Sequence, residues 1–348
     1  MKKKLLIFTL INLGIAALAA MAPIALIGGG EYERQRVVFD FVDSVQAGQS
    51  LSVIIGDSRS ECCLPAAEMG FVNLSLAGGA PPEGYYLVRR LLDRGARIER
   101  LIVSFGGFHV HTQDAYYART RYYGLIDPVF IDEVNRKIVE LDDAEYRRYG
   151  WKALETIDAK LAFLPEAAKF GIVNVLSLDT TIKGAIRGAR RRLDPATGRE
   201  ISDPRYKLRE ISTAEFINEE PDSPESQRPD ADSPVNGHYL SRLAALAREN
   251  GIAVYFLNMP MNAGVAQPPQ QYFQRFDDVI ERSGFEGCYS GARFWPNALF
   301  WDASHLNADG AARLRTELVP GLRYCLPGPQ QPAAAATSRD PASRRPSG

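Results

Sequence analysis

The segment Leu51-Ser52-Val53-Ile54-Ile55-Gly56-Asp57-Ser58-Arg59-Ser60 decides the fold class of this chain. Its first half is short, β-branched and mostly apolar, which is typical of a strand that is buried on both faces of a parallel sheet. Glycine, aspartate and serine then interrupt the apolar run, as residues at a strand-to-helix turn do. The sequence therefore predicts that Ser58 lies at the carboxyl edge of a sheet.

Three further short apolar runs predict buried strands at residues 71–74, 101–103 and 252–257. Apolar residues at helical spacing separate and follow these runs. They predict helices at residues 60–69, 83–93, 239–250, 271–282 and 307–318. Strands that alternate with helices pair in parallel through right-handed crossovers. The sequence thus predicts an α/β fold with one parallel sheet.

A long segment interrupts this alternation between residues 109 and 234. It is mostly helical in pattern, and its last part, residues 219–234, is rich in proline and acidic side chains and predicts a mobile loop. We expect one sheet domain formed by residues 31–108 and 235–326, with residues 109–234 as an insertion lying over the sheet. Residues 327–348 are rich in proline, alanine and serine and predict a disordered tail.

The N-terminal segment has the pattern of a signal anchor. Lysines at positions 2–4 precede an uncharged, mostly apolar stretch from Leu5 to Gly28. This stretch is longer than the about 20 residues that a transmembrane helix needs, and a cleaved signal peptide has a shorter apolar region. The segment Ala17-Leu18-Ala19, with alanine at both ends, leaves cleavage open as the alternative. Because the lysines favour a cytoplasmic N-terminus, residues 1–30 predict a single-pass inner-membrane protein whose sheet domain is periplasmic, if the source is a Gram-negative bacterium.

Composition excludes several classes of function. The 41 basic and 42 acidic residues give a net charge of −1, so the chain lacks the basic character of a nucleic-acid-binding protein. Four cysteines are too few for a disulfide-built scaffold, although export permits disulfides. Cys288 and Cys325 are candidates for one pair. The adjacent Cys62 and Cys63 are interpreted as small, buried apolar side chains on the first helix.

Asp302 and His305 form the second segment that carries chemistry. They supply a carboxylate and an imidazole three residues apart, and Ser58 supplies a hydroxyl. Together these groups can make a neutral hydroxyl nucleophilic. Because ligands bind beyond the carboxyl ends of the strands in an open parallel sheet, we expect Ser58 to meet the loops that contain Gly78 and Gly107. Asp302 and His305 precede the last predicted helix, which can bring His305 beside Ser58.

These segments, in this order, resemble the conserved blocks of the SGNH, or GDSL-like, hydrolase superfamily. The Gly-Asp-Ser segment that contains Ser58 resembles the nucleophile block, and Gly78 matches the glycine whose N–H points at the oxyanion. Asp302 and His305 match the Asp-x-x-His block in spacing and order. The resemblance covers the sheet domain and not residues 109–234. It implies a three-layer, flavodoxin-like parallel sheet with helices on both faces.

The third block departs from the family pattern. The family places Gly-x-Asn-Asp there, and its asparagine donates to the oxyanion, whereas this chain has Gly106-Gly107-Phe108-His109. The side chain of His109 and the N–H of Gly107 are the candidates for the missing donor.

Polar residues beside these blocks have alternative interpretations. Asp57 is interpreted as a structural turn residue. Arg59 and His109 are candidates for binding substrate, Arg59 through an anionic group, and a solvated surface arginine is the alternative for Arg59. His109 and His111 form an i, i+2 pair that could hold a metal ion, but no carboxylate or cysteine cluster accompanies them, so no metal site is predicted.

The resemblance also implies roles for the candidate residues. Ser58 Oγ attacks an ester carbonyl, His305 accepts and returns its proton, and Asp302 orients the imidazole. The oxyanion forms against the N–H groups of Ser58 and Gly78. Such a transfer needs no metal or nucleotide cofactor.

An acyl-enzyme does not determine which molecule accepts the acyl group. The predicted anchor makes the chain similar to exported SGNH-like proteins that O-acetylate alginate and other cell-surface polysaccharides, and to membrane-anchored proteins of D-alanyl transfer to teichoic acids. This resemblance implies transfer of an acyl group, such as acetyl, from a membrane-bound O-acyltransferase partner to a polysaccharide or glycan. An exported carbohydrate or lipid esterase and a catalytically silent scaffold for envelope-polysaccharide assembly are the alternatives.

Overall fold

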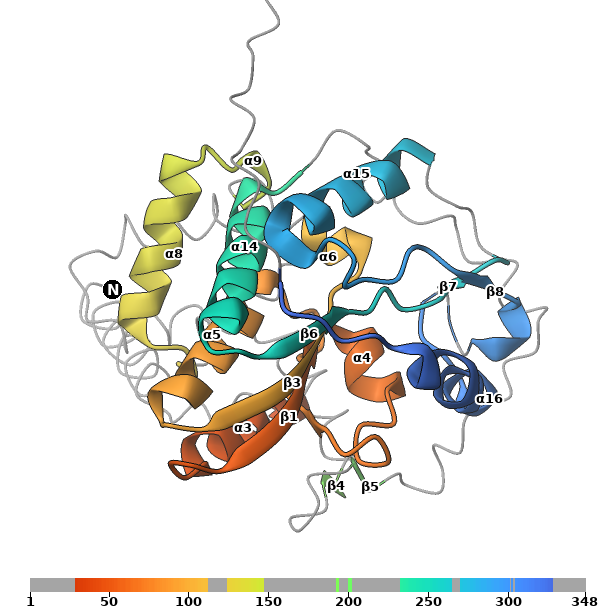
Figure 1. Cartoon of the computed structure of the whole chain (residues 1–348), viewed down its shortest axis with the longest axis horizontal. Helices are drawn as coiled ribbons and strands as arrows, with labels where there is room; N and C mark the ends of the chain where they lie inside the picture. The colour runs from red at the N-terminus through yellow and green to blue at the C-terminus, as the bar shows by residue number, and fades with distance from the viewer. Residues whose placement is uncertain are drawn as a thin grey trace, which may run out of the picture.

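A parallel sheet forms the centre of the molecule (Figure 1). The computed structural model describes residues 29–111, 124–146, 192–193, 200–201, 232–264, 270–300, 302 and 304–327. The sheet has the strand order β2-β1-β3-β6, and the strands are β1 (Ser50–Gly56), β2 (Val72–Asn73), β3 (Arg97–Ser104) and β6 (Ala253–Phe256). Every neighbouring pair in this sheet is parallel. The predicted α/β class is therefore confirmed, and the strand order is consistent with a flavodoxin-like fold.

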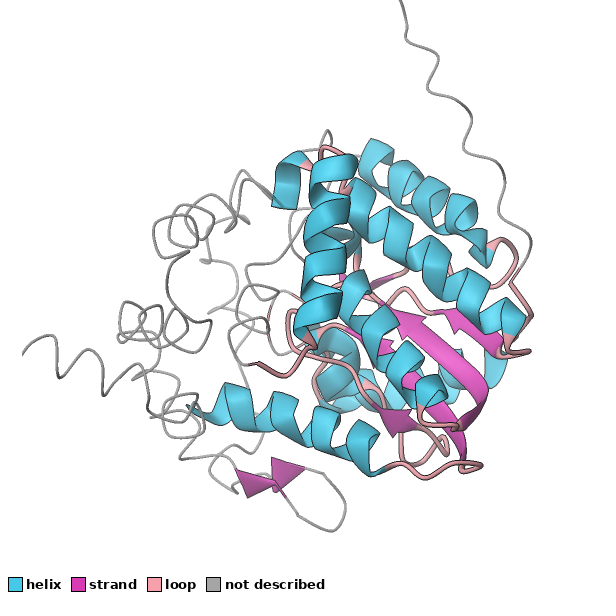
Figure 2. Ribbon diagram, turned by 90° about the vertical axis from the view of Figure 1, so that its left-hand side faces the viewer, coloured by secondary structure: helices cyan, strands magenta, loops and turns pink. Residues whose placement is uncertain are grey.

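Helices alternate with these strands and pack beside them (Figure 2). They are α3 (Gly29–Ser44), α4 (Ser58–Cys63), α5 (Pro81–Asp93), α14 (Pro234–Glu249), α15 (Gln270–Ile280) and α16 (Ala308–Arg313). The last two continue as π-helical turns over Glu281–Phe285 and Leu314–Leu318. The helix predicted at residues 60–69 is wrong in its bounds. Pro65 excludes the helical conformation for the residue before it, and Leu64 is extended, so α4 ends at Cys63.

Shorter elements complete the described part of the chain. They are α6 (Gly107–His111), α8 (Pro128–Glu140), α9 (Ala144–Tyr146), β4 (Arg192–Leu193), β5 (Glu200–Ile201), β7 (Met261–Asn262), β8 (Phe294–Trp295) and the 3₁₀ turns Asn297–Leu299 and Val319–Gly321. β4 and β5 form an antiparallel pair, and β7 and β8 form a parallel pair apart from the main sheet.

The central strands separate two apolar cores because successive side chains of a strand point to opposite faces. Val53 and Ile55 of β1 belong to the larger core, which also contains side chains of α3, α5, α14 and α15. Ile54 belongs to the second core, where it meets residues of α4 and of the chain around α16. All three side chains are fully buried. The sheet is therefore covered on both faces.

The described residues between 109 and 146 share the larger core of the sheet domain. Phe130 on α8 is fully buried there, and its ring centroid lies 4.9 Å from that of Tyr86 on α5. The helix α14 begins where Ser233 accepts a hydrogen bond from the N–H of Asn236. The predicted loop over residues 219–234 lies outside the described residues up to position 231, and its last residue, Pro234, begins α14. Most of the predicted insertion and the predicted tail after residue 327 also lie outside the described residues.

The predicted signal anchor also falls on residues that the structure does not describe, apart from the start of α3. Within the described ranges, no helix combines the length and the apolar character that crossing a bilayer requires.

The free edge of β6 is covered by the C-terminal part of the chain. Val254 exchanges backbone hydrogen bonds with Cys325, and the N–H of Phe256 donates to the carbonyl of Cys288. Cys288 and Cys325 are joined by a disulfide with their Cα atoms 5.7 Å apart, a usual separation for such a bond. The pairing that the sequence left open is thus present, and it fastens the chain on both sides of α16 to the sheet edge.

Candidate active site

The switch point of the sheet lies between β1 and β3. The chain passes from β1 to β2 on one side and then returns to β3 on the other side, and crevices form beyond the carboxyl ends of strands at such points. Gly56 ends β1 against Ser104, the last residue of β3, and a Cβ atom on Gly56 would lie 2.1 Å from the Ser104 carbonyl oxygen. The close approach of the two strand ends therefore requires glycine at position 56. It places the following residue pair, Asp57 and Ser58, at the switch point.

Ser58 is the first residue of α4, and Asp57 is its N-cap. The Oδ1 atom of Asp57 accepts a hydrogen bond from the N–H of Arg59 at 3.0 Å. Capping of this kind satisfies a backbone donor that a helix start leaves unpaired. The interpretation of Asp57 as a structural turn residue is confirmed, and the cap fixes the backbone that carries the Ser58 hydroxyl.

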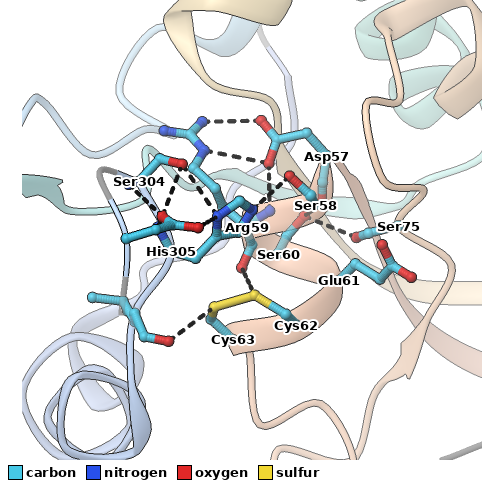
Figure 3. The surroundings of a disulfide bond; sticks show 12 residues. Asp57, Ser58, Arg59, Ser60, Glu61, Cys62, Cys63, Ser75, Ser304 and His305 are labelled. Atoms are coloured by element: carbon cyan, nitrogen blue, oxygen red, sulfur yellow. Dashed lines mark hydrogen bonds and ion pairs between the residues drawn. A yellow bond between two sulfur atoms is a disulfide. The ribbon is translucent and has the colours of Figure 1, made fainter. Parts of the chain in front are cut away.

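Ser58, His305 and Asp302 form a continuous hydrogen-bonded chain. The Nε2 atom of His305 lies 2.9 Å from Ser58 Oγ, and its Nδ1 atom lies 2.6 Å from Asp302 Oδ2. Figure 3 shows the His305 ring beside Ser58 at the start of α4. Both side chains of the His305–Asp302 pair are partly accessible, with 21% and 31% of their surface exposed. The arrangement can remove a proton from the Ser58 hydroxyl and hold it on the imidazole.

The loop before α16 orients Asp302. Its Oδ1 atom accepts hydrogen bonds from the N–H groups of Ser304 and His305, both at 2.7 Å. Burial by itself would raise the pKa of Asp302, but the hydrogen bond and charge of His305 and these two N–H groups outweigh it, so the pKa lies below its usual value. Asp302 is therefore ionised at neutral pH, and its second oxygen is free of the backbone and directed at the imidazole.

The loop that contains Gly78 lies against the nucleophile turn. The N–H of Leu76 donates to the carbonyl of Gly56 at 3.0 Å, and a Cβ atom on Gly79 would lie 2.9 Å from that same oxygen. Gly78 itself has a φ of +66°, a conformation that favours glycine. The structure thus brings the second predicted segment next to Ser58, and the role of the Gly78 N–H toward an oxyanion stays a prediction.

The third segment also meets the nucleophile turn, through Asp57. The N–H of Gly106 donates to Asp57 Oδ2 at 2.7 Å. The Nε2 atom of His109 lies 3.8 Å from the same carboxylate oxygen. His111, in contrast, faces Asp232, with 2.8 Å between His111 Nδ1 and Asp232 Oδ1. The two histidines therefore face different carboxylates.

Asp57 is held as a charged group in the interior. Its side chain is fully buried, and burial alone would raise its pKa. The charge of Arg59, the nearby His109 and the hydrogen bonds from Arg59 and Gly106 outweigh burial and lower the pKa of Asp57 to about 2. Asp57 is thus ionised at neutral pH and links the nucleophile turn to the segment after β3.

Arg59 folds back onto Asp57 (Figure 3). Its Nη2 atom lies 3.0 Å from Asp57 Oδ2, and its Nε atom lies 3.4 Å from Oδ1. Only 14% of its side chain is exposed. The alternative of a solvated surface arginine is therefore wrong.

Several residues that support the site were not predicted from the sequence. Ser60 Oγ lies 2.9 Å from Ser75 Oγ, and the side chain of Asn73 donates to the carbonyl of Ser60 at 2.8 Å. Tyr272 of α15 lies over Gly107, where a Cβ atom would come within 2.5 Å of its hydroxyl. Asn73 lies in the predicted strand at residues 71–74 and Ser75 directly follows it, and a polar residue at the end of a strand is a usable signal for a site residue. Tyr272 is remote in sequence and has no such signal.

Asn262 of β7 supports the loop that carries Asp302. Its side chain is almost fully buried, and its Nδ2 atom donates to Asn297 Oδ1 at 2.7 Å and lies 3.4 Å from the carbonyl oxygen of Asp302. Its Oδ1 atom accepts from the N–H of Gly264 at 2.8 Å. One buried amide thus connects β7 to the two turns on either side of Phe300.

Cys62 and Cys63 lie on α4, the helix after β1, as predicted, and they form its C-terminal end. Cys63 is buried in the second core, but Cys62 is exposed, and the two sulfur atoms are joined in a disulfide (Figure 3). The interpretation of both residues as buried apolar side chains is therefore wrong for Cys62. Position 62 lies on the outer face of α4, and position 63 lies on the face that packs on the second core.

Comparison of this chain with protein-family models gives no match, and comparison with curated proteins gives none either.

Proposed function

We propose that this chain is an SGNH-type serine acyltransferase that is exported and anchored in the inner membrane. It moves an acyl group, such as acetyl, onto a cell-surface polysaccharide or glycan. One observation carries the proposal: Ser58, His305 and Asp302 stand in hydrogen-bonding register at the switch point of the sheet. A hydroxyl, an imidazole and an ionised carboxylate in this order are the groups that serine acyl transfer uses.

The reaction follows from this geometry in two steps. Ser58 Oγ attacks the donor's carbonyl carbon while His305 Nε2 takes the hydroxyl proton, and the carbonyl π electrons move to oxygen. When the carbonyl re-forms, the bond to the leaving oxygen breaks, and that oxygen takes the proton from His305. A sugar hydroxyl then repeats the sequence on the acyl-Ser58 ester and leaves as the acylated product. Asp302 keeps Nδ1 protonated, so that Nε2 can accept the proton of Ser58.

The choice of a glycan acceptor and of a membrane-bound O-acyltransferase as donor rests on the N-terminal sequence and the family resemblance. The 21% exposure of His305 and the partial exposure of Ser58 allow an acceptor to reach the acyl group. Water could take the same place, in which case the protein is an exported esterase. The two activities share every step up to the acyl-enzyme and differ only in the second nucleophile.

A labelling experiment tests the shared part of the proposal. A fluorophosphonate probe should label the wild-type protein, and Ser58→Ala should abolish labelling. Ser304→Ala is a matched control because Ser304 is a more exposed serine of the same site whose hydroxyl lies 3.2 Å from His305 Nδ1 and not from Nε2. Equal labelling of wild type and Ser58→Ala, or no labelling of folded wild type, contradicts the proposal and favours a catalytically silent scaffold.

A partition experiment separates transfer from hydrolysis. The wild-type protein is given a chromogenic acetyl ester with and without a soluble oligosaccharide acceptor, and acetylated sugar and free acetate are both measured. Transfer predicts that the acceptor raises total turnover and that most of the acyl group appears on sugar. Turnover that yields only acetate at every acceptor concentration identifies an esterase.

A further inference from the structure

We propose that Arg59 stabilises the oxyanion that forms when Ser58 attacks a carbonyl group. This inference rests on the proposed serine chemistry and adds a residue role to it. Attack on a carbonyl carbon places negative charge on the carbonyl oxygen, and fixed donors beside the nucleophile lower the free energy of that state. Arg59 is the cationic side chain next to the nucleophile in sequence, and its position is fixed by contacts on two sides.

The first of these contacts is with Asp57, and it leaves part of the guanidinium uncommitted. Nε and Nη2 of Arg59 face the Asp57 carboxylate. Among the residues that the structure describes, none accepts a hydrogen bond from Nη1 of Arg59. An arginine fork that binds a carboxylate with one edge keeps N–H donors on its other edge. Those donors are the ones available to an oxyanion.

Accessibility also distinguishes the two ends of this ion pair. The Asp57 side chain is fully buried, whereas 14% of the Arg59 side chain is exposed. The accessible part of this ion pair therefore belongs to the guanidinium. Asp57 holds the cation in place and stays out of contact with the reacting atoms.

The second contact is with Gly106, which follows β3 across the switch point. A Cβ atom on Gly106 would lie 1.6 Å from Nη2 and 2.8 Å from Nη1 of Arg59. The guanidinium therefore lies directly over the Gly106 α-carbon and fills the space that a side chain at this position would occupy. The Gly106 N–H donates to Asp57 and is not available to an oxyanion, and the donor roles of the Gly107 N–H and of His109 stay predictions. In the proposed arrangement the guanidinium of Arg59, which lies over Gly106, donates a hydrogen bond to the oxyanion.

Two single variants test this role by different means. Arg59→Ala removes the guanidinium, and Gly106→Ala keeps it but displaces it through steric overlap. Each should lower kcat for a chromogenic acyl ester by about 10²–10³-fold with little change in KM, because the lost interaction exists only in the transition state. The double variant should be no slower than the slower single variant, since both changes remove the same interaction.

Chemical rescue separates this role from a structural one. Guanidinium ion at millimolar concentration should restore part of the kcat of Arg59→Ala and none of that of Gly106→Ala, in which the added methyl group still blocks the position. Arg59→Lys should be intermediate, because it keeps the charge and loses the fork. Gly237→Ala and Arg315→Ala are the matched controls: Gly237 has open space around its α-carbon, and Arg315 is an exposed arginine in an ion pair. Both should keep the wild-type kcat.

Removal of Arg59 leaves Asp57 buried without its main counter-ion, which can unfold the protein. The paired change Asp57→Asn with Arg59→Gln removes both charges and keeps a capping side chain, and it should show the same loss of kcat. Wild-type kcat in folded Gly106→Ala and in this paired variant overturns the proposal, as does a loss that appears only in KM. A wild-type protein with no acyl turnover and no fluorophosphonate labelling instead removes the proposed function and the Arg59 role together.

Discussion

The imidazole of His305 lies 2.9 Å from the hydroxyl of Ser58, although 247 positions separate the two residues in the chain. Ser58 follows β1, the first strand, and His305 lies in the turn that precedes α16, near the end of the described chain. Neither local segment would hold the other in place. Their contact therefore depends on the packing of the whole sheet domain.

His305→Ala should abolish acyl turnover and lower kcat by about 10⁴-fold or more. Among the described residues, no other base is within hydrogen-bonding distance of Ser58 Oγ to accept its proton. The His305 side chain is partly exposed, so the variant should unfold at nearly the same denaturant concentration as wild type. Steady-state kinetics and a denaturant titration measure the two effects. Undiminished turnover in this variant would show that the assigned base is wrong.

Asp302→Asn should reduce kcat severely, by about 10²–10⁴-fold, and less than His305→Ala does. The asparagine amide can still contact Nδ1 but cannot balance the positive charge of a protonated imidazole. Because the lowered pKa of Asp302 keeps it ionised at neutral pH, wild-type activity should be independent of Asp302 titration there and should fall only in acid. A pH profile of kcat for both proteins checks this; a variant that equals wild type at neutral pH contradicts it.

Asp57 should make the stability of the protein sensitive to acid. Its pKa is about 2 in the folded protein and lies below its ordinary value of 3.8, so ionised Asp57 stabilises the fold above about pH 4. This contribution, about 2 kcal/mol, is lost as the pH falls from about 4 toward 2. Asp57→Asn should be less stable than wild type at pH 6, and the difference should shrink as the pH falls through this range. Denaturant unfolding at several pH values measures it, and a difference that is constant with pH would contradict the assignment.

The disulfide between Cys288 and Cys325 should stabilise the edge of the sheet. It closes a loop of sequence separation 37 and holds the chain that pairs with β6, so replacing both cysteines by serine should lower the free energy of unfolding by about 2–4 kcal/mol. Dithiothreitol should destabilise wild type by a similar amount and leave this variant almost unchanged. The Cys62→Ser, Cys63→Ser variant serves as the control for the other pair, and it should respond to dithiothreitol as wild type does.

Asn262→Ala should affect both stability and rate. It leaves the partly buried side chain of Asn297 and the N–H of Gly264 without their hydrogen bonds to Asn262, at a cost of about 0.5–1.5 kcal/mol each. Because Asn262 also contacts the Asp302 carbonyl, kcat should fall about tenfold or more through misplacement of the loop, with KM little changed. Asn250→Ala, at an exposed amide that bonds only within its own helix end, is the control and should change stability by less than about 0.5 kcal/mol. Equal kcat in Asn262→Ala and wild type would show that this amide has only a structural role.

The sequence by itself determined the parts of the molecule that depend on local pattern. The β-branched runs before Gly56 and around residues 101–103 and 252–257 are buried strands, because side-chain alternation and apolar length are properties of the segment alone. The same holds for the turn that exposes Ser58 and for the pairing of Asp302 with His305, whose separation of three residues fixes their distance. Even there, Pro65 ended α4 earlier than the apolar spacing indicated.

Only the tertiary structure decided which segments meet. The strand order brings Gly106 against Asp57, and the packing of the chain around α16 on the second core brings His305 to Ser58. The contact of Asn262 with Asp302 likewise has no local signal. The physical reason is that these contacts join residues far apart in the chain, and their free energy comes from burial and pairing of groups that no single segment contains.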